Sequence, residues 1–76
     1  MSVGNNIKKY RKEKNISQEE LAAAIQCSVD TISRYETGKR CPGLEQAIRL
    51  ARYFHMGLER IFYLEQDFTD EKGGPS

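Results

Sequence analysis

Residues 17–38 read SQEELAAAIQCSVDTISRYETG, a pattern that predicts two short helices joined by a tight turn. Ser17 is placed to cap the first helix, because its hydroxyl can accept the backbone N–H of Glu20, whose carboxylate can reach back to close a capping box. Ser28 is placed to cap the second helix, and Gly38 supplies the left-handed residue that ends it. Helix, short turn and helix is the geometry of the DNA-reading helix-turn-helix.

A wider pattern around these two helices resembles a known family. Residues 16–22 read ISQEELA, Ser28 follows as the second cap, and residues 35–42 read YETGKRCP. Together they resemble the phage-repressor-like helix-turn-helix family of the Cro/C1 type, also called the XRE family, over about residues 7–62. The resemblance implies an all-α fold, namely a compact five-helix bundle with a central helix-turn-helix, like the DNA-binding domain of the lambda repressor.

Three further helices complete the expected bundle. One is expected over residues 7–14, another over residues 44–54, where apolar residues recur at helical spacing, and a short last one over residues 57–62. The positions expected to face the core in the last two are Leu44, Ala47, Ile48, Ala51, Phe54, Leu58, Ile61 and Phe62. Residues 1–66 are therefore expected to form a helix-turn-helix DNA-binding domain without strands, in which residues 1–4 are loose.

The remaining residues, 67–76, are acidic and then end in Gly-Gly-Pro-Ser, a composition that predicts a disordered tail. The 76 residues, 38% of them hydrophobic and 30% charged, are typical of one small globular domain. No apolar run approaches the roughly 20 residues that span a bilayer, and the N-terminus lacks the apolar core of a signal peptide. We therefore expect a cytoplasmic protein with no membrane partner.

The charge is distributed unevenly along the chain. The formal net charge is only +1, but residues 1–40 hold eight Lys and Arg against five Asp and Glu, whereas residues 41–76 hold four against six. The basic half contains the predicted helix-turn-helix. This distribution favours a positive footprint for DNA on that part of the molecule.

Residues that carry other chemistry are sparse. Cys27 and Cys41 lie 14 positions apart and His55 is the single histidine, so the sequence lacks the four ligands of a zinc site, and we expect no metal or other cofactor. Cys27 is expected to be a small buried apolar residue, and Cys41 to lie in an exposed loop. We find no nucleophile–base pair, paired catalytic carboxylates or Gly-rich phosphate loop in the sequence, so we do not expect an enzyme.

The second helix of the predicted helix-turn-helix, residues 29–37, is the expected recognition helix, and one of its sides is expected to face away from the core. Stepping by 3.6 residues per turn places on that side Val29, Asp30, Ser33, Arg34 and Thr37. Arg34 can donate two bonds to guanine O6 and N7, Asp30 can accept from cytosine N4, and Val29 can pack on a thymine methyl. Asp30 can equally be an acid that favours the helix start through the macrodipole. The resemblance implies base readers at Val29, Asp30 and Arg34, and Ser33 is the fourth candidate for a base contact.

Phosphate contacts are expected on either side of this helix. The resemblance implies that Gln18, at the start of the preceding helix, clamps a backbone phosphate with its side chain and its backbone N–H. The other candidates for phosphate contacts are Ser28, Thr37, Lys39 and Arg40. The resemblance also implies a structural ion pair between Arg11 and Glu36 that holds the recognition helix against the first helix.

Two positions depart from the family pattern, in which Gly is usual. Gln26 occupies the turn between the two central helices, and His55 stands at the end of the helix over residues 44–54. A residue other than glycine in the left-handed conformation costs roughly 1 kcal/mol, so we expect some strain at Gln26. We interpret His55 as a tolerated helix-end residue and not as a ligand or a base.

The resemblance implies a sequence-specific transcriptional regulator of double-stranded DNA, with repression as the expected mode. One such module covers a half-site, so we expect a homodimer on a pseudo-palindromic operator with half-sites about 34 Å apart or a multiple of that. The apolar residues Tyr63, Leu64 and Phe68 could form the self-contact, or they could fold back on their own domain. The alternative function is an antitoxin-type or other protein-interaction module, in which this same fold binds a partner protein.

Overall fold

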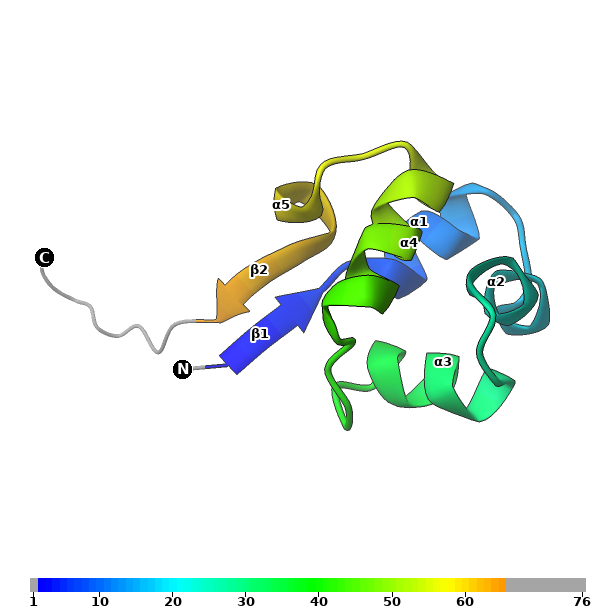
Figure 1. The fold of residues 1–76 in the computed structure, drawn as a ribbon, viewed down its shortest axis with the longest axis horizontal. Helices are drawn as coiled ribbons and strands as arrows, with labels where there is room; N and C mark the ends of the chain where they lie inside the picture. The colour runs from blue at the N-terminus through cyan, green and yellow to red at the C-terminus, as the bar shows by residue number, and fades with distance from the viewer. Residues whose placement is uncertain (1, 66–76) are drawn as a thin grey trace, which may run out of the picture.

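The computed structural model describes residues 2–65 of the chain. Over these residues five helices are framed by two short strands (Figure 1). The bounds are β1 Ser2–Asn5, α1 Ile7–Glu13, α2 Gln18–Ile25, α3 Val29–Glu36, α4 Leu44–Phe54, α5 Leu58–Ile61 and β2 Phe62–Glu65. The strands extend from one end of the helical bundle, and α2 lies at the other end (Figure 1). The predicted tail, residues 67–76, lies outside the described residues.

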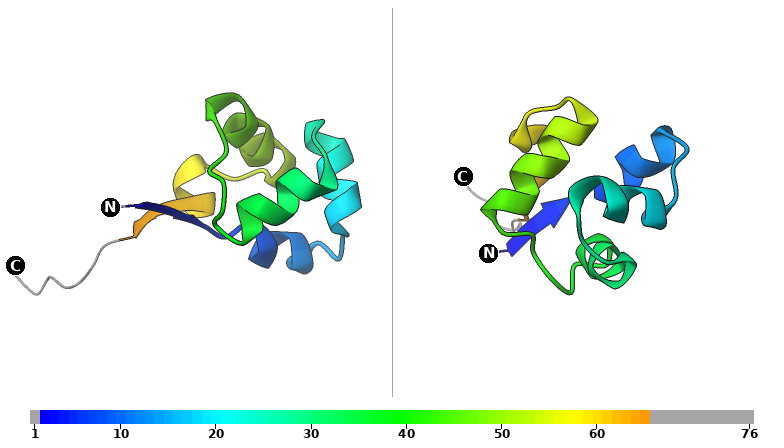
Figure 2. Two further views of the ribbon diagram at one scale, coloured as in Figure 1. Left: turned by 90° about the horizontal axis from the view of Figure 1, so that it is seen from below. Right: turned by 45° about the vertical axis from the view of Figure 1, so that its right-hand side comes forward.

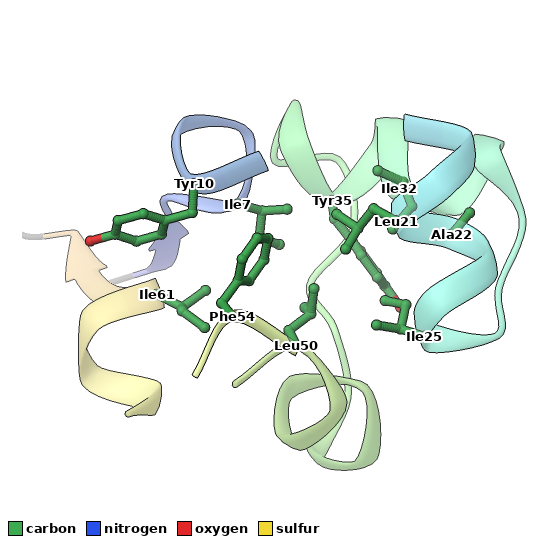
Figure 3. Packing of buried hydrophobic residues seen from close by; sticks show 10 residues of the cluster. All are labelled: Ile7, Tyr10, Leu21, Ala22, Ile25, Ile32, Tyr35, Leu50, Phe54 and Ile61. Carbon is green, nitrogen blue, oxygen red and sulfur yellow. The ribbon is translucent and has the colours of Figure 1, made fainter. Parts of the chain in front are cut away.

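The core lies where the five helices meet (Figure 3). Among residues 2–65, the large side chains that are fully buried are Ile7, Leu21, Ile25, Ile32, Leu50 and Ile61. The rings of Tyr10 and Phe54 lie 6.2 Å apart and join α1 to α4. The inner face predicted for the first helix of the helix-turn-helix is confirmed, because Leu21, Ala22 and Ile25 are all buried.

The structure corrects part of the inward face that we predicted for α4 and α5, whereas Phe54 and Ile61 are buried as predicted. Leu44, Ile48 and Leu58 are exposed, by 73%, 41% and 38% respectively. Besides the predicted Phe54, the buried residue of α4 is Leu50, which lies four residues before it. Two apolar stripes with the same spacing therefore run beside one another on α4, and periodicity alone cannot tell which of them the bundle covers.

A two-stranded antiparallel sheet corrects the prediction of an all-α domain. β1 pairs with β2 in a register that sets Val3 opposite Leu64 and Gly4 opposite Tyr63. Residues 2–5 are therefore a strand and not the loose segment that we expected. Each strand has only four residues, too few for an alternating pattern to stand out in the sequence.

Tyr63 folds back on its own domain through this pairing. Its ring lies across Gly4, where a Cβ atom would collide with ring atoms, so the ring could not keep this position over any other residue. Tyr63 and Leu64 nevertheless remain 45% and 60% exposed. The third apolar residue of the expected self-contact, Phe68, lies outside the described residues.

The predicted starts of the two central helices are confirmed. Ser17 Oγ accepts a hydrogen bond from the backbone N–H of Glu20 at 3.0 Å, and Glu20 Oε1 accepts one from the backbone N–H of Ser17 at 2.9 Å. These two bonds complete the capping box of α2. Ser28 Oγ accepts from the backbone N–H of Thr31 at 3.1 Å and caps α3.

The ends of the helices use the left-handed conformation. Gly38, after α3, has φ 79°, as its place in the sequence predicts. Within the described residues, the residues other than glycine with positive φ are Asn15 at 58°, Gln26 at 63° and His55 at 57°. Each of these three stands at or just after the end of a helix and carries the cost of roughly 1 kcal/mol that a Cβ incurs there.

Candidate nucleic-acid interface

α3 turns one side to the core and the other to solvent. Ile32 and Tyr35, which are 0% and 3% exposed, fix the inner side. The outer side is formed by the exposed residues Val29, Asp30, Arg34 and Thr37 and by the half-buried Ser33. In Figure 2 (left), which views the molecule from below, α3 lies in front of the other elements. The five positions predicted from helical spacing therefore lie on one accessible side.

Glu36 anchors the C-terminal end of α3 from behind. Arg11 Nε donates to Glu36 Oε2 at 2.7 Å, and Arg11 Nη2 donates to Glu36 Oε1 at 3.3 Å, so the contact is bidentate. Arg11 Nη1 also donates to the carbonyl oxygen of Ile16 at 2.9 Å. The side chains of Arg11 and Glu36 are only 11% and 3% exposed. This buried ion pair joins α1, the segment before α2 and the end of α3.

Gln18 is drawn into the same network. Its Nε2 donates to Glu36 Oε1 at 3.0 Å, and the residue is half-buried. An amide nitrogen carries two N–H bonds, so this contact leaves one for an external acceptor. The side chain that sequence analysis assigns to a phosphate is thus held in place by the carboxylate that anchors α3.

Asp30 and Arg34 contact one another on the outer side of α3. Asp30 Oδ2 lies 2.9 Å from Arg34 Nε, and the two side chains are 72% and 58% exposed. The spacing of four residues brings them together on one face of the helix. Sequence analysis considered them as separate base readers and missed this contact, although the spacing alone could have indicated it.

The two hydroxyl candidates are engaged with their own helix. Ser28 Oγ, besides capping α3, lies 2.9 Å from Thr31 Oγ1. Thr37 Oγ1 donates its one proton to the carbonyl oxygen of Ser33 at 2.9 Å. A hydroxyl has one donor, so Thr37 would have to give up this bond to donate to a phosphate. We therefore rank Ser28 and Thr37 below Gln18, Lys39 and Arg40 as phosphate contacts.

Lys39 and Arg40 lie in the exposed segment directly after α3. Their backbone N–H groups both donate to the carbonyl oxygen of Arg34, at 2.9 and 3.2 Å. These bonds tie the segment to the last turn of the helix, where two cations also suit the negative end of the helix dipole. The backbone of both residues is thus held near the C-terminal end of α3, and their side chains are open to solvent.

Arg49 supports the turn between α2 and α3, a role that sequence analysis missed. Its Nη1 donates to Gln26 Oε1 at 2.7 Å and to the carbonyl oxygen of Ile25 at 3.3 Å, and its Nη2 donates to Glu45 Oε2 at 2.6 Å. Gln26 thus makes a contact that the usual glycine could not make. Nothing in the local sequence signals it, because the partners lie 23 residues apart.

Burial controls the ionisation of the groups behind α3. It raises the pKa of the thiol of Cys27, which is half-buried and not fully buried as we expected. Burial also raises the pKa of the Tyr35 phenol, and the nearby Cys27 adds to this shift while Arg40 opposes it. Both groups are therefore uncharged near neutral pH, and neither adds a charge to those of the Arg11–Glu36 ion pair and of the exposed side chains of α3.

Residues 2–65 hold neither a cluster of metal ligands nor a membrane-spanning helix. In this part of the chain no group of three or more His, Cys, Asp and Glu side chains gathers into a metal site. No helix there is long and apolar enough to cross a membrane.

The comparison with known sequences agrees with this geometry. A family model described as helix-turn-helix matches residues 7–61. An uncharacterised HTH-type transcriptional regulator of Methanocaldococcus jannaschii is 40% identical over 63 residues, which cover 83% of this chain and 96% of the relative. An uncharacterised HTH-type transcriptional regulator of Archaeoglobus fulgidus is 38% identical over 66 residues, covering 87% of this chain and 93% of the relative.

Solved structures share the fold as well. A transcriptional regulator from Listeria innocua superposes with a TM-score of 0.73 at 27% identity, covering 86% of this chain and 62% of that one. The family match spans α1 to α5 and includes the whole surface built around α3. The chain therefore belongs to the Cro/C1-type helix-turn-helix family and is related to transcriptional regulators.

Proposed function

We propose that this protein binds double-stranded DNA in a sequence-specific way by placing α3 in the major groove, and that it thereby represses transcription. The observation that carries the proposal is the division of α3 into an anchored and an open side. Ile32, Tyr35 and Glu36 hold it from behind, while Val29 and Arg34 remain accessible in front. A helix held in this way presents its side chains to base edges with little loss of freedom on binding.

The open side offers usable readout chemistry. Arg34 provides the paired donors that guanine O6 and N7 accept, and Val29, at the N-terminal end of α3, offers a methyl surface for thymine. Asp30 and Ser33 complete the proposed set of base contacts. The N-terminal residues of a recognition helix lie nearest the base edges, which suits Val29 and Asp30.

The proposed phosphate contacts lie at two places around α3. Gln18 and the backbone N–H groups at the start of α2 form one, and Lys39 and Arg40 after α3 form the other. Such contacts set the register of the protein on the duplex and carry little sequence information themselves. They should make the affinity depend strongly on salt.

We propose that the DNA-bound form is a homodimer and that the strand side forms its interface. The exposed apolar residues Val3, Leu58, Tyr63 and Leu64 gather there, around an open hollow of about 410 Å³. Each strand of a two-stranded sheet also has an edge free of the other strand. A surface of this kind can pair with its own copy about a two-fold axis, which would place two α3 helices on one pseudo-palindromic site.

Two finer assignments belong to the same proposal. The first is that residues 1–66 are the DNA-binding domain and residues 67–76 its tail. The second is that the protein acts in the cytoplasm, where a bacterial or archaeal regulator meets DNA.

Selection of bound duplexes from a random DNA pool tests the proposal. We expect an enriched motif with two-fold symmetry, whose affinity exceeds that for random DNA by roughly 10³-fold or more at physiological salt. A reporter promoter that carries the motif should then lose transcription when the protein is present. Enrichment of no motif, with equal binding to all duplexes at low salt, would contradict sequence-specific binding.

The alternative function, an antitoxin-type or other protein-interaction module, uses the same apolar surface. Sedimentation of the purified protein separates the two possibilities. A dimer at micromolar concentration supports the homodimer. A protein that is monomeric both alone and on the selected duplex would support the alternative, in which the apolar surface binds a different protein.

A further inference from the structure

Two of the proposed base readers contact one another in the protein without DNA. Asp30 Oδ2 lies 2.9 Å from Arg34 Nε across one turn of α3. Both side chains are largely exposed, at 72% and 58%, so no surrounding packing forces them together. The ion pair favours those rotamers of the long Arg34 side chain that keep it beside Asp30.

The atom that Arg34 uses in this contact determines what it can still donate. Nε lies 2.9 Å from the carboxylate, and within residues 2–65 the two terminal nitrogens, Nη1 and Nη2, have no hydrogen-bond partner. These two nitrogens form a planar pair of donors that matches guanine O6 and N7. A carboxylate at Nε therefore leaves the reading end of the guanidinium open.

The same contact changes what Asp30 can do. A lone carboxylate in the groove would meet the negative potential of the phosphates, whereas the Asp30 charge is balanced by Arg34. One of its oxygens is already committed to the guanidinium. The observed geometry thus suits Asp30 better as a support for Arg34 than as an independent reader of cytosine.

We infer that Asp30 is a positioning residue that orients Arg34 toward a guanine, so that the two side chains read one base pair as a unit. This inference rests on the proposed function. It also assigns the pair a part in discrimination, because the nearby Asp30 carboxylate offsets the positive charge of Arg34 and so weakens its attraction to phosphates at random sites. Without Asp30 the arginine should bind random DNA better and the chosen guanine less selectively.

Competition binding with a panel of duplexes tests this assignment. Each base pair of the selected site is replaced in turn, and the wild type is compared with Asp30→Ala, Arg34→Ala and the double variant. Arg34→Ala should reduce the preference for guanine at one position by about 5- to 150-fold. Asp30→Ala should reduce it at that same position by about 2- to 10-fold, the effect of releasing one ordered side chain. The double variant should match Arg34→Ala.

The chain offers a matched control for the loss of an acid near a helix start. Glu45 stands in the first turn of α4 and pairs with Arg49, four residues later, at 2.6 Å. Glu45→Ala should leave every base preference unchanged. Circular dichroism should show all four variants folded, since the side chains are on the surface or half-buried.

The outcomes separate the inference from the proposed function. If Asp30→Ala relaxes a different position from Arg34→Ala, or if their effects multiply in the double variant, Asp30 reads its own base and the inference is overturned. If the wild type has no base preference at all, the proposed function fails and the inference fails with it.

Discussion

The two sides of this small domain expose different chemistry. Around α3 the exposed side chains are charged or polar except for Val29, and Asp30, Arg34 and Thr37 make contacts within their own helix. Around the strands and α5 the exposed side chains include the apolar Val3 and Leu64, which lie opposite one another in the pairing. Ordered donors suit the reading of bases, and apolar area suits association with another protein surface. The contrast indicates that the domain separates recognition from assembly.

The largest effect should come from the anchor behind α3. Glu36→Ala leaves the Arg11 guanidinium buried without its carboxylate, so we expect a loss of about 3–5 kcal/mol in the free energy of unfolding. Urea unfolding followed by circular dichroism measures it. Glu36→Gln, which keeps an acceptor for Arg11, should lose less and remain folded for DNA-binding assays.

A second ion pair provides the control. Glu45 is 77% exposed, and its pair with Arg49 should contribute less than about 1 kcal/mol. Equal losses from Glu45→Ala and Glu36→Ala would show that the buried pair does not anchor the recognition helix.

The next effect should appear on the strand side. Leu64→Lys places a charge in the proposed interface and should weaken self-association by about 1–2 kcal/mol, the free energy gained when the 60% of Leu64 that is exposed becomes buried. Sedimentation over a range of concentrations measures it. Leu44→Lys alters a more exposed leucine of α4, outside the proposed interface, and should leave the dimer intact. A dimer that tolerates Leu64→Lys would place the interface elsewhere.

A smaller effect should separate phosphate contacts from base contacts. Lys39→Ala should weaken binding to every duplex alike and reduce the slope of log K against log salt by about 0.9, the value for one phosphate. Titrations at several salt concentrations measure the slope. Arg60→Ala removes an exposed cation from the strand side and should not change it. An unchanged slope for Lys39→Ala would remove Lys39 from the phosphate contacts.

The smallest effect is expected at His55, which belongs neither to the recognition side around α3 nor to the strand side. His55 has φ 57° at the end of α4, so His55→Gly should relieve left-handed strain and stabilise the fold by about 0.5–1 kcal/mol. Thermal unfolding measures the change, and both DNA binding and self-association should stay as in the wild type. A destabilised His55→Gly would mean that the side chain makes a favourable contact that outweighs the strain.

The sequence predicts the recognition side well because the signals there are local. The capping box of Ser17 and Glu20, the cap at Ser28 and the stop at Gly38 each depend on residues within a few positions of one another. The outer side of α3 follows from helical spacing once the helix is known. The pairing of Arg11 with Glu36 came only from the family resemblance, because the two residues are 25 positions apart.

The strand side could not be predicted in the same way. β1 and β2 are separated by most of the chain, and neither has enough residues for a periodic pattern. The pairing of the two strands brings Val3 and Leu64 side by side, so the apolar surface that these residues form can be found only from the folded structure. The choice between two apolar stripes on α4 depended likewise on the packing of the other helices.

The most direct test of base reading by α3 is an NMR study of the protein on its selected duplex. We expect intermolecular contacts from the Val29 methyls and the Arg34 side chain to base edges in the major groove, while the amide signals of β1 and β2 change little on addition of DNA. Contacts to DNA that come instead from the strand side, with the α3 signals unchanged, would contradict the assignment of α3 as the recognition helix.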